Sequence, residues 1–408
     1  MDYGYNSNLF SPRQSRLNWR LALQTERFSM ELLLKTLSRL IFVFTLGRLR
    51  YSRPIEGNSL HMNWGEKFWY AYKFYGHPIY EPEHNKGIRE HFEEHPIEGF
   101  NKTSLSDESL TIGLAGDLLP CPDFPATPSG HLADVVSFFT QADINCANLE
   151  SPVARRQPKS ILPKSIASPP GMNNSPEAVL YLLQGALRQQ GTPSVTVFST
   201  ANNHSLDTGV EGVIETLDFL DETGARQVGM ARNAAERDAL LLLEVKGFKI
   251  AFLSWTFGLN NNTLPEGQEY LVNTLRLNLP NVDISPLASQ VQEARQRGAE
   301  FVVLCLHWGL EYEGFPLVSQ IETAHRLAEC GVDVICGNHP HMLQPAERYV
   351  WGEQRECLIA YALGDLLSPY PSLHASAITA VMQVTLVRQS DGCVVIQQVT
   401  RDLLDGRR

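Results

Sequence analysis

The chain has 408 residues, of which 43% are hydrophobic and 19% are charged. This composition is typical of a globular protein and leaves room for one large domain or two smaller ones. The net charge is −11, so we expect no nucleic-acid partner, because a phosphate backbone repels an acidic protein. The seven cysteines form no C-x-x-C pair, and Cys305 and Cys336 lie in apolar runs. We therefore predict buried thiols in a reducing compartment.

Residues 1–53 form a basic N-terminal segment, with nine lysines and arginines against three acidic residues. Leu33, Leu37 and Leu40 recur at helical spacing, which predicts an amphipathic helix within residues 29–53. Its apolar runs are far shorter than the roughly 20 residues needed to span a bilayer. The helix either contacts an anionic membrane surface peripherally or packs its apolar face on the main domain. In both cases we expect a cytoplasmic protein.

Residues 54–108 form a second predicted region, an extension rich in aromatic residues and histidine. Within it, residues 91–95 read His-Phe-Glu-Glu-His, which fits the H-x-x-E-H pattern of one class of zinc proteases. Pro96 follows at once and would end the helix that such a site requires. We therefore interpret the motif as a solvated helix end.

From residue 109 onwards the chain alternates between apolar strands and helices. Strands are predicted at Leu110–Ala115, Ser194–Thr200, Glu300–Leu306, Val332–Cys336 and Leu358–Leu363. Helices are predicted over Val210–Glu222, from Ser285 to Gly298 and over Val318–Cys330. Two hairpins join Ala239–Val245 to Lys249–Trp255 and Ala377–Val387 to Cys393–Thr400. Parallel βα units combined with hairpins indicate an α/β domain with mixed sheets over residues 109–408.

Polar residues follow the predicted strands at or just past their C-terminal ends: Asp117, Asn203, His204, His307, His339 and His341. The carboxyl ends of strands in an open α/β sheet form the edge where such folds place their sites. Carboxylate, amide and imidazole groups without thiolates suit Mn²⁺, Fe²⁺ or Zn²⁺. The sequence therefore predicts a divalent-metal centre at this edge.

The motifs around these residues resemble those of a known family. They are Gly116-Asp117, Asn148-Leu149-Glu150-Ser151-Pro152, Ala201-Asn202-Asn203-His204 with Asp207-Thr208-Gly209, His307-Trp308-Gly309-Leu310-Glu311-Tyr312, Gly337-Asn338-His339-Pro340-His341 and Tyr361-Ala362-Leu363-Gly364-Asp365. In this order they resemble the CapA/PgsA proteins of poly-γ-glutamate capsule synthesis, a branch of the calcineurin-like metallophosphoesterases. The resemblance covers about residues 110–387. It implies a metallophosphoesterase-like αββα sandwich with two mixed β-sheets, preceded by an N-terminal extension.

The resemblance also implies two metal ions bridged by the carboxylate of Glu150. Three further ligands would complete the site of one ion: Asn203, His307 and His339. Two ligands would hold the other ion: Asp117 and His341. His204 would face the leaving group as a general acid, and Asp207 would either orient His204 or cap the helix that follows.

Two positions depart from the patterns of these relatives. The wider superfamily opens with Asp-x-His, whereas this chain has Asp117-Leu118-Leu119, so the ion at Asp117 would keep three protein ligands at most. The chain therefore holds either two ions or a single ion on the side of His307. Asp365 stands where the family usually has Asn, and it is either an added ligand or a partner of a ligand.

The stretch from Ser151 to Pro176 is proline-rich and contains Arg155, Arg156 and Lys164 but no acidic residue. These three basic residues, with Glu311, are the predicted substrate-binding residues. The substrate would be an anionic small molecule or a polyglutamate-like polymer. The alternative is that the stretch is a solvated surface loop.

Two functions remain open for the chain. The first is a metal-dependent hydrolase of an ester, phosphoester or amide bond, in capsule-type polymer synthesis or a related pathway. The second is a non-catalytic component of a polymer synthesis or export complex that binds metal or polyglutamate. No phosphate loop, dinucleotide fingerprint or serine-hydrolase elbow is present in the sequence. Three histidines outside the motifs are interpreted as structural: His131, His325 and His374.

Overall fold

A computed structural model describes residues 36–37, 40–41, 56–58, 61–75, 78–83, 86–100, 108–120, 141–157, 160–163, 170–189, 194–353, 355–368 and 378–405. The chain divides into two compact units, one made of residues 1–53 and 68–78 and the other of residues 54–67 and 79–408. Most of the predicted amphipathic helix lies outside the described residues. Within the described residues, no helix has both the length and the apolar character that crossing a membrane requires.

The first of two large β-sheets has seven strands, in the order β15-β14-β1-β2-β5-β6, with β13 also paired to β1. Strands β1, β2, β5 and β6 pair in parallel, whereas β1, β14 and β15 pair antiparallel. The bounds are β1 Ser109–Leu118, β2 Ile144–Leu149, β5 Val195–Ser199, β6 Arg226–Val228, β13 Asp365–Leu367, β14 Ile378–Arg388 and β15 Val394–Asp405.

The second large sheet has six strands, in the order β11-β12-β10-β9-β8-β7. Its four central strands run parallel, and the two outer strands, β7 and β11, pair antiparallel. The bounds are β7 Leu241–Val245, β8 Phe248–Thr256, β9 Phe301–His307, β10 Val334–Asn338, β11 Ala346–Trp351 and β12 Arg355–Ala360. Both sheets are therefore mixed, as predicted.

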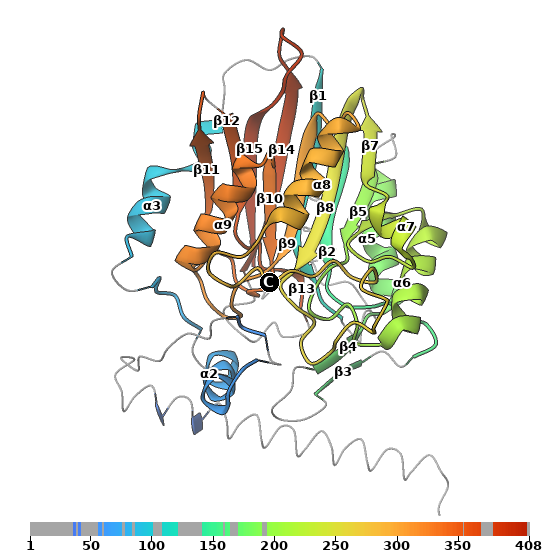
Figure 1. The fold of residues 1–408 in the computed structure, drawn as a ribbon, viewed down its shortest axis with the longest axis vertical. Coiled ribbons are helices and arrows are strands. Elements are labelled where there is room, and N and C mark those ends of the chain that lie inside the picture. Colours follow the sequence, from blue (N-terminus) through green and yellow to red (C-terminus); the bar gives the residue numbers. More distant parts are fainter. Residues whose placement is uncertain are drawn as a thin grey trace, which may run out of the picture. The chain divides into compact units, whose positions relative to one another are not determined.

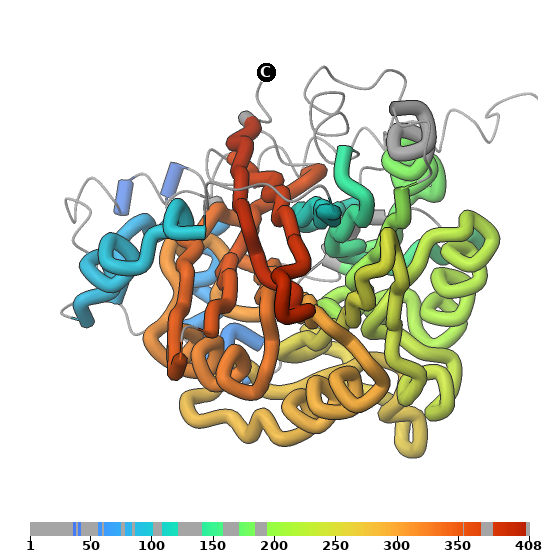
Figure 2. Tube along the Cα trace, turned by 90° about the horizontal axis from the view of Figure 1, so that it is seen from above, coloured from blue at the N-terminus to red at the C-terminus, as the bar shows by residue number. Residues whose placement is uncertain are grey.

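The two sheets pack face to face, with helices on the outer faces (Figure 1). One buried cluster joins β1, β2 and β14 to β8, β9 and β10 and forms the core between the sheets. A second cluster packs α8 (Ser285–Gln296) and α9 (Val318–Glu329) on the six-stranded sheet. A third packs α5 (Pro176–Gln189) and α6 (Gly209–Thr223) on the seven-stranded sheet. Figure 2 shows these helices, orange and green, on different sides of the strands. The predicted αββα sandwich is confirmed.

The amphipathic spacing of α8 explains why this helix covers a sheet. Leu287, Val291 and Ala294 are buried and recur every three or four residues, so they lie on one face of the helix. Burying an apolar side chain of this size stabilises the fold by roughly 1.5–3 kcal/mol. The helix ends just before Gly298, which adopts a left-handed backbone with φ of 93°, as the sequence predicted.

One predicted strand has the wrong C-terminal boundary. Within the apolar run Leu358–Leu363 the strand β12 ends at Ala360, and the next strand, β13, begins only at Asp365. Strand β12 belongs to the six-stranded sheet, whereas β13 pairs with β1 in the seven-stranded sheet. The chain therefore changes sheets between these strands, and Gly364, with φ of 79°, lies at the turn.

The remaining described elements lie outside the two sheets and their main covering helices. They are α2 Trp64–Tyr75, α3 Ile88–Glu94, the 3-10 helix η1 Ile97–Phe100, α7 Ala234–Asp238 and the small antiparallel pair β3 Ser160–Pro163 and β4 Pro170–Asn173. Cys305 and Cys336 are buried, as predicted. The prediction is wrong for Cys330 and Cys393, which are free but exposed because they lie at a helix end and in a turn.

A candidate metal centre at the sheet edge

The six predicted metal ligands come from the C-terminal ends of strands in both sheets. Asp117 lies in β1, Glu150 directly follows β2, and Asn203 lies in the loop after β5. From the other sheet, His307 is the last residue of β9. His339 and His341 follow β10. We call this set the sheet-edge centre: Asp117, Glu150, Asn203, His307, His339 and His341. All six residues are buried.

Two glycines allow the backbones around this centre to approach closely. A Cβ atom at Gly116 would lie 1.8 Å from the Gly364 carbonyl oxygen. At Gly337 it would lie 1.9 Å from the Tyr361 carbonyl oxygen. Neither distance is physically possible, so both positions require glycine. The segment that changes sheets therefore passes directly against the strands that carry Asp117 and His339.

His307 lies at the middle of the centre. Its Nε2 atom is 2.9 Å from Asn203 Oδ1 and 3.6 Å from Glu150 Oε1. Its Nδ1 atom is 3.2 Å from the side-chain nitrogen of Asn148, which also donates a hydrogen bond of 2.7 Å to Asp117 Oδ1. Asn148 thus connects a ligand from each sheet.

His341 approaches the same oxygen of Glu150 as His307 does. Its Nε2 atom lies 3.7 Å from Glu150 Oε1, and its Nδ1 atom lies 2.9 Å from Asp365 Oδ1. A carboxylate on one ring nitrogen leaves the other nitrogen available as a ligand, which is the usual arrangement of metal-binding histidines. The contact therefore favours Asp365 as a partner that orients His341. His339 contributes through its backbone as well, because its N–H donates to Asp117 Oδ2 at 3.0 Å.

Glu150 is the less satisfied of the two carboxylates of the centre. It is completely buried, and among the described residues neither of its carboxylate oxygens has a hydrogen-bond partner. Burial, together with repulsion from Asp117, raises the pKa of Glu150 well above its ordinary value. A buried polar group without a partner is costly, so a cation is the natural complement of this carboxylate.

The pKa values of three other residues of the centre are also shifted. Burial raises the pKa of the Asp117 carboxyl to about 6, although His341 opposes the rise. Burial and the neighbouring histidines lower the pKa of His307 well below its ordinary value. Burial alone would lower the pKa of His341, but Glu150 and Asp365 raise it well above its ordinary value. Carboxylates held together with neutral imidazole form a donor set suited to divalent metals.

The ligand atoms are close enough to hold metal ions. Three overlapping groups each place their ligand atoms within 4.8 Å of one another: Glu150 with His339 and His341, Asp117 with His341 and Asp365, and Asp117 with Glu150 and His307. Glu150 and Asp117 each belong to two of these groups. The residues therefore fit one or two divalent ions, with Glu150 positioned between His307 and His341.

His204 and Asp207 form a buried pair beside the centre. His204 Nδ1 lies 2.6 Å from Asp207 Oδ2. The Asp207 carboxylate also accepts hydrogen bonds from the Met172 backbone N–H at 2.8 Å and from the Asn262 side chain at 3.0 Å. The residue that caps α6 is Thr208. Of the two predicted alternatives, the geometry therefore favours orientation of His204.

Two of the predicted substrate-binding residues, Arg155 and Arg156, face carboxylates of α6. Arg155 makes two hydrogen bonds of 2.7 Å to Glu222 of α6, and Arg156 is exposed, with its Nε atom 3.9 Å from Glu215. Glu311 lies near enough to Glu150 for its charge to raise the pKa of Glu150 further. Lys164 lies outside the described residues.

Three asparagines support the centre without having been assigned a role from the sequence. Asn148 joins Asp117 to His307, Asn260 accepts a hydrogen bond of 3.3 Å from Asn203, and Asn262 holds Asp207. Asn148 is a polar residue inside a fully buried strand, and a polar residue in such a strand is a signal of a functional role. Asn260 and Asn262 belong to a run of three asparagines just after β8, at the same edge.

An Asp365→Asn substitution tests the role of Asp365. The amide oxygen can still accept the Nδ1–H of His341, so we expect metal affinity to fall no more than about 10–100-fold. Asp365→Leu removes the acceptor and should cause a larger loss. Elemental analysis after equilibrium dialysis measures both variants. Complete loss of one metal equivalent in Asp365→Asn alone would instead make Asp365 a direct ligand.

Two mixed sheets whose strand ends gather buried imidazoles and carboxylates define an α/β sandwich with a candidate divalent-metal centre. The sequence model of the family described as bacterial capsule synthesis protein PGA_cap matches residues 111–370. The protein belongs to this family, so the resemblance predicted from the sequence is confirmed.

Individual relatives are more distant. The capsule biosynthesis protein CapA of Bacillus anthracis is 26% identical over 268 residues, covering 64% of this chain and 60% of that protein. The PGA biosynthesis protein CapA of Bacillus subtilis is 26% identical over 279 residues, covering 65% and 64%. This chain thus spans about three fifths of the length of these curated relatives. A solved NAD nucleotidase of Haemophilus influenzae is 12% identical, with a TM-score of 0.40, over 73% of this chain and 56% of its own.

Proposed function

We propose that the protein is a metal-dependent hydrolase of an ester, phosphoester or amide bond in a capsule-type polymer or a related biosynthetic product. The observation that carries the proposal is Glu150, a fully buried carboxylate that among the described residues lacks any hydrogen-bond partner. His307 and His341 approach one of its oxygens at 3.6 and 3.7 Å. This is the placement expected of a carboxylate that would bind metal together with both histidines.

Bound divalent ions would supply a water molecule of lowered pKa and would neutralise negative charge on the reacting group. The centre's own residues would hold the ions through His307, Asn203 and His339 on one side and through His341 and Asp117 on the other. Asn203 is a suitable ligand because its neutral oxygen adds no charge that would repel an anionic substrate.

His204 would deliver the proton to the leaving group. With its Nδ1–H donated to the Asp207 carboxylate, the imidazole keeps one orientation and leaves Nε2 to carry the transferable proton. Asp207 is itself fixed by Met172 and Asn262, so the pair is preorganised. Such a general acid contributes roughly 10²–10⁴-fold to the rate.

The proposed substrate is an anionic polymer of the polyglutamate type or a phosphorylated precursor. The support is membership of the capsule synthesis family and the similarity to the PGA biosynthesis protein CapA of Bacillus subtilis. Arg156 is the exposed basic side chain nearest in sequence to Glu150 that is not held in a bidentate ion pair. Peripheral membrane contact through residues 29–53 stays a separate proposal.

The kinetic effect of His204→Ala tests the general-acid role. On protein reconstituted with Mn²⁺, we expect kcat for phenyl phosphate to fall about 10²–10⁴-fold while metal content stays unchanged. The loss should be much smaller with p-nitrophenyl phosphate, whose leaving group needs no proton. Asp207→Asn should show the same dependence on the leaving group. Equal losses with both substrates would contradict proton donation by His204.

A non-catalytic binding component is the second candidate. The observation in its favour is Leu119, a buried apolar residue where the wider superfamily carries a histidine ligand. On this interpretation the reconstituted protein hydrolyses neither aryl phosphates nor poly-γ-glutamate but binds poly-γ-glutamate in a metal-dependent manner. Isothermal titration with poly-γ-glutamate, combined with a product assay, distinguishes the two functions.

A further inference from the structure

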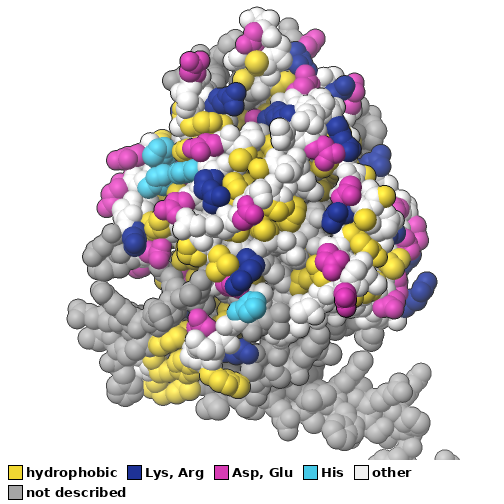
Figure 3. Space-filling view, in the orientation of Figure 1, with side chains coloured by type: hydrophobic (Ala, Val, Ile, Leu, Met, Phe, Trp, Pro, Cys, Tyr) yellow, Lys and Arg dark blue, Asp and Glu magenta, His cyan; other side chains and the backbone are white. Residues whose placement is uncertain are grey.

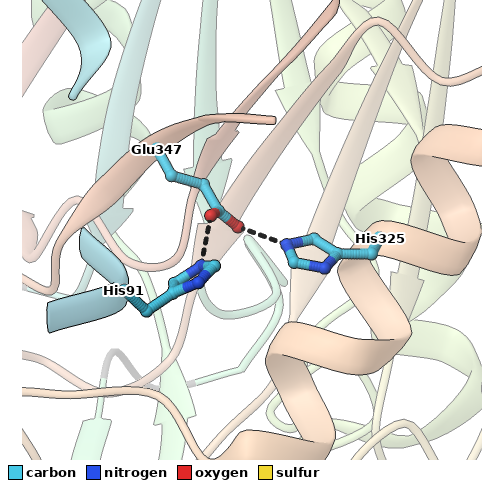
Figure 4. A group of neighbouring side chains, drawn as sticks. All are labelled: His91, His325 and Glu347. Carbon is cyan, nitrogen blue, oxygen red and sulfur yellow. Dashed lines mark hydrogen bonds and ion pairs between the residues drawn. The ribbon is translucent and has the colours of Figure 1, made fainter. Parts of the chain in front are cut away.

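A second cluster of metal-ligating side chains lies outside the sheet-edge centre and shares no residue with it. It consists of His91 from α3, His325 from α9 and Glu347 from β11, and we call it the outer cluster (Figure 4). Its ligand atoms lie within 4.8 Å of one another. Three elements that are distant in sequence thus converge on one carboxylate.

The two imidazoles approach opposite oxygens of the same carboxylate. His91 Nε2 lies 2.5 Å from Glu347 Oε2, and His325 Nε2 lies 2.8 Å from Glu347 Oε1. Figure 4 shows both rings directed at the carboxylate from either side. Tyr361 donates a further hydrogen bond of 2.7 Å to Oε1. Donors on both oxygens keep Glu347 ionised, so the cluster presents a buried anion between two potential nitrogen ligands.

The surroundings hold the outer cluster in place while leaving it accessible. The Glu347 side chain is completely buried, whereas the side chains of His91 and His325 are 22% and 21% exposed. The His325 ring stacks on Tyr349 with a centroid distance of 3.8 Å. Histidine side chains reach the surface together on the side of the molecule where α3 lies (Figure 3). An ion can therefore enter from solvent onto a fixed carboxylate.

The H-x-x-E-H motif contributes only its first histidine. The helix ends at Glu94, ahead of Pro96 as predicted, and His95 Nδ1 contacts the His91 carbonyl oxygen at 2.8 Å. His95 is thus directed at its own helix. The prediction of a solvated helix end is wrong for His91, because this residue is paired with Glu347.

We infer that the outer cluster binds one divalent cation of the zinc class through His91, His325 and Glu347, with water completing the coordination. Two imidazoles and one carboxylate are a zinc donor set, whereas Mg²⁺ and Ca²⁺ prefer oxygen ligands alone. Metal–ligand distances of about 2.0–2.1 Å place neighbouring ligand atoms roughly 3.3 Å apart in a tetrahedral site. The partly exposed histidines must therefore move outward by less than about 1 Å, replacing shared protons with the ion.

The consequence of this binding is structural. The ion would connect α3, which precedes the first strand, to α9 and β11 on the outer side of the six-stranded sheet. Occupancy would then stabilise the folded protein, and the gain would rise with the logarithm of the free Zn²⁺ concentration above the dissociation constant. His325, interpreted as structural from the sequence, would be a metal ligand instead.

Zinc stoichiometry of matched variants tests the inference. The full chain is stripped with chelator and loaded with Zn²⁺, and bound zinc is counted for wild type, His91→Ala and His95→Ala. His95→Ala is the matched control, since it removes a histidine from the end of the same helix. We expect His91→Ala to bind one equivalent less than wild type, with affinity at this site lowered by at least about 100-fold, and His95→Ala to equal wild type.

Chemical modification of the wild type decides the question even if a variant fails to fold. Diethyl pyrocarbonate acylates accessible neutral imidazoles, and mass spectrometry locates the modified residues. Zn²⁺ should protect His91 and His325 while leaving the exposed His61 as reactive as before. Unchanged zinc stoichiometry in His91→Ala, or undiminished modification of His91 and His325 in saturating Zn²⁺, would overturn the inference and leave a hydrogen-bonded cluster only.

Discussion

A Glu150→Gln variant should lose the metal ions of the sheet-edge centre and yet unfold, in chelator, at the same or a higher temperature than wild type. The two effects have opposite signs because Glu150 is costly without metal. Its carboxylate is buried without a hydrogen-bond partner among the described residues, and repulsion from Asp117 adds to the cost. Burying this carboxyl is costly at pH 7 whether it stays ionised or takes up a proton, so replacing it with an amide relieves the metal-free protein by up to about 2 kcal/mol. The substitution also removes the shared ligand, so affinity should fall by at least about 100-fold.

The measurement is thermal unfolding with and without Mn²⁺, together with metal content. Wild type should gain stability on Mn²⁺ addition, whereas Glu150→Gln should not respond. Glu244→Gln is the control, because Glu244 is an exposed carboxylate that pairs with Lys249 near the start of β8, at the sheet edge opposite the centre. If Glu150→Gln retains wild-type metal content, Glu150 is not a ligand and the proposed hydrolytic centre loses its main support.

A Gly116→Ala variant should have the largest effect on stability, abolishing cooperative folding or costing at least about 4 kcal/mol. The added Cβ would lie 1.8 Å from the Gly364 carbonyl oxygen, a backbone atom that no rotamer change can move. Relief would require β1 to separate from the segment that leads into β13. The hydrogen bond from the Asp117 N–H to the Gly364 carbonyl oxygen, 2.9 Å long, would then be lost too.

Denaturant unfolding compares this variant with Gly224→Ala. Gly224 has a left-handed φ of 77°, but a Cβ there meets nothing within 4 Å. The control should therefore cost only about 1 kcal/mol, the usual penalty for alanine at a left-handed position. Near-equal losses in the two variants would show that the close approach at Gly116 is accommodated by movement of the backbone.

Local patterns predicted the mixed sheets and most of the residues that gather at the sheet edge, whereas the αββα layers and Glu150 came from the family resemblance. Apolar runs such as Glu300–Leu306 end directly at polar residues such as His307, and β9 ends at that residue. In parallel strands, polar residues at the C-terminal ends lie at one edge of the sheet, whatever the order of the strands. The two hairpins and the helix that ends at Gly224 were also predicted from local sequence patterns.

The features that escaped prediction depend on contacts between distant segments. Leu358–Leu363 is continuous in its hydrophobicity, yet β12 ends within it at Ala360, and the next strand, β13, pairs with β1 in the other sheet. Asn262 supports Asp207 across a long stretch of sequence, and nothing local to either residue signals the contact. His91 was likewise matched to its neighbour His95 in sequence, whereas its contact is Glu347.

The pairing of β1 with β14 has a consequence for synthesis of the chain. Leu110 lies opposite Leu386 in this antiparallel pair, so the strand that carries Asp117 has its antiparallel partner beyond residue 370, where the match to the family model ends. The ribosome therefore releases β1 long before β14 exists, and the seven-stranded sheet is completed only after most of the chain has emerged. Until then the apolar edge of β1 needs protection, so we expect nascent chains truncated before residue 378 to bind chaperones and to degrade faster than the full chain.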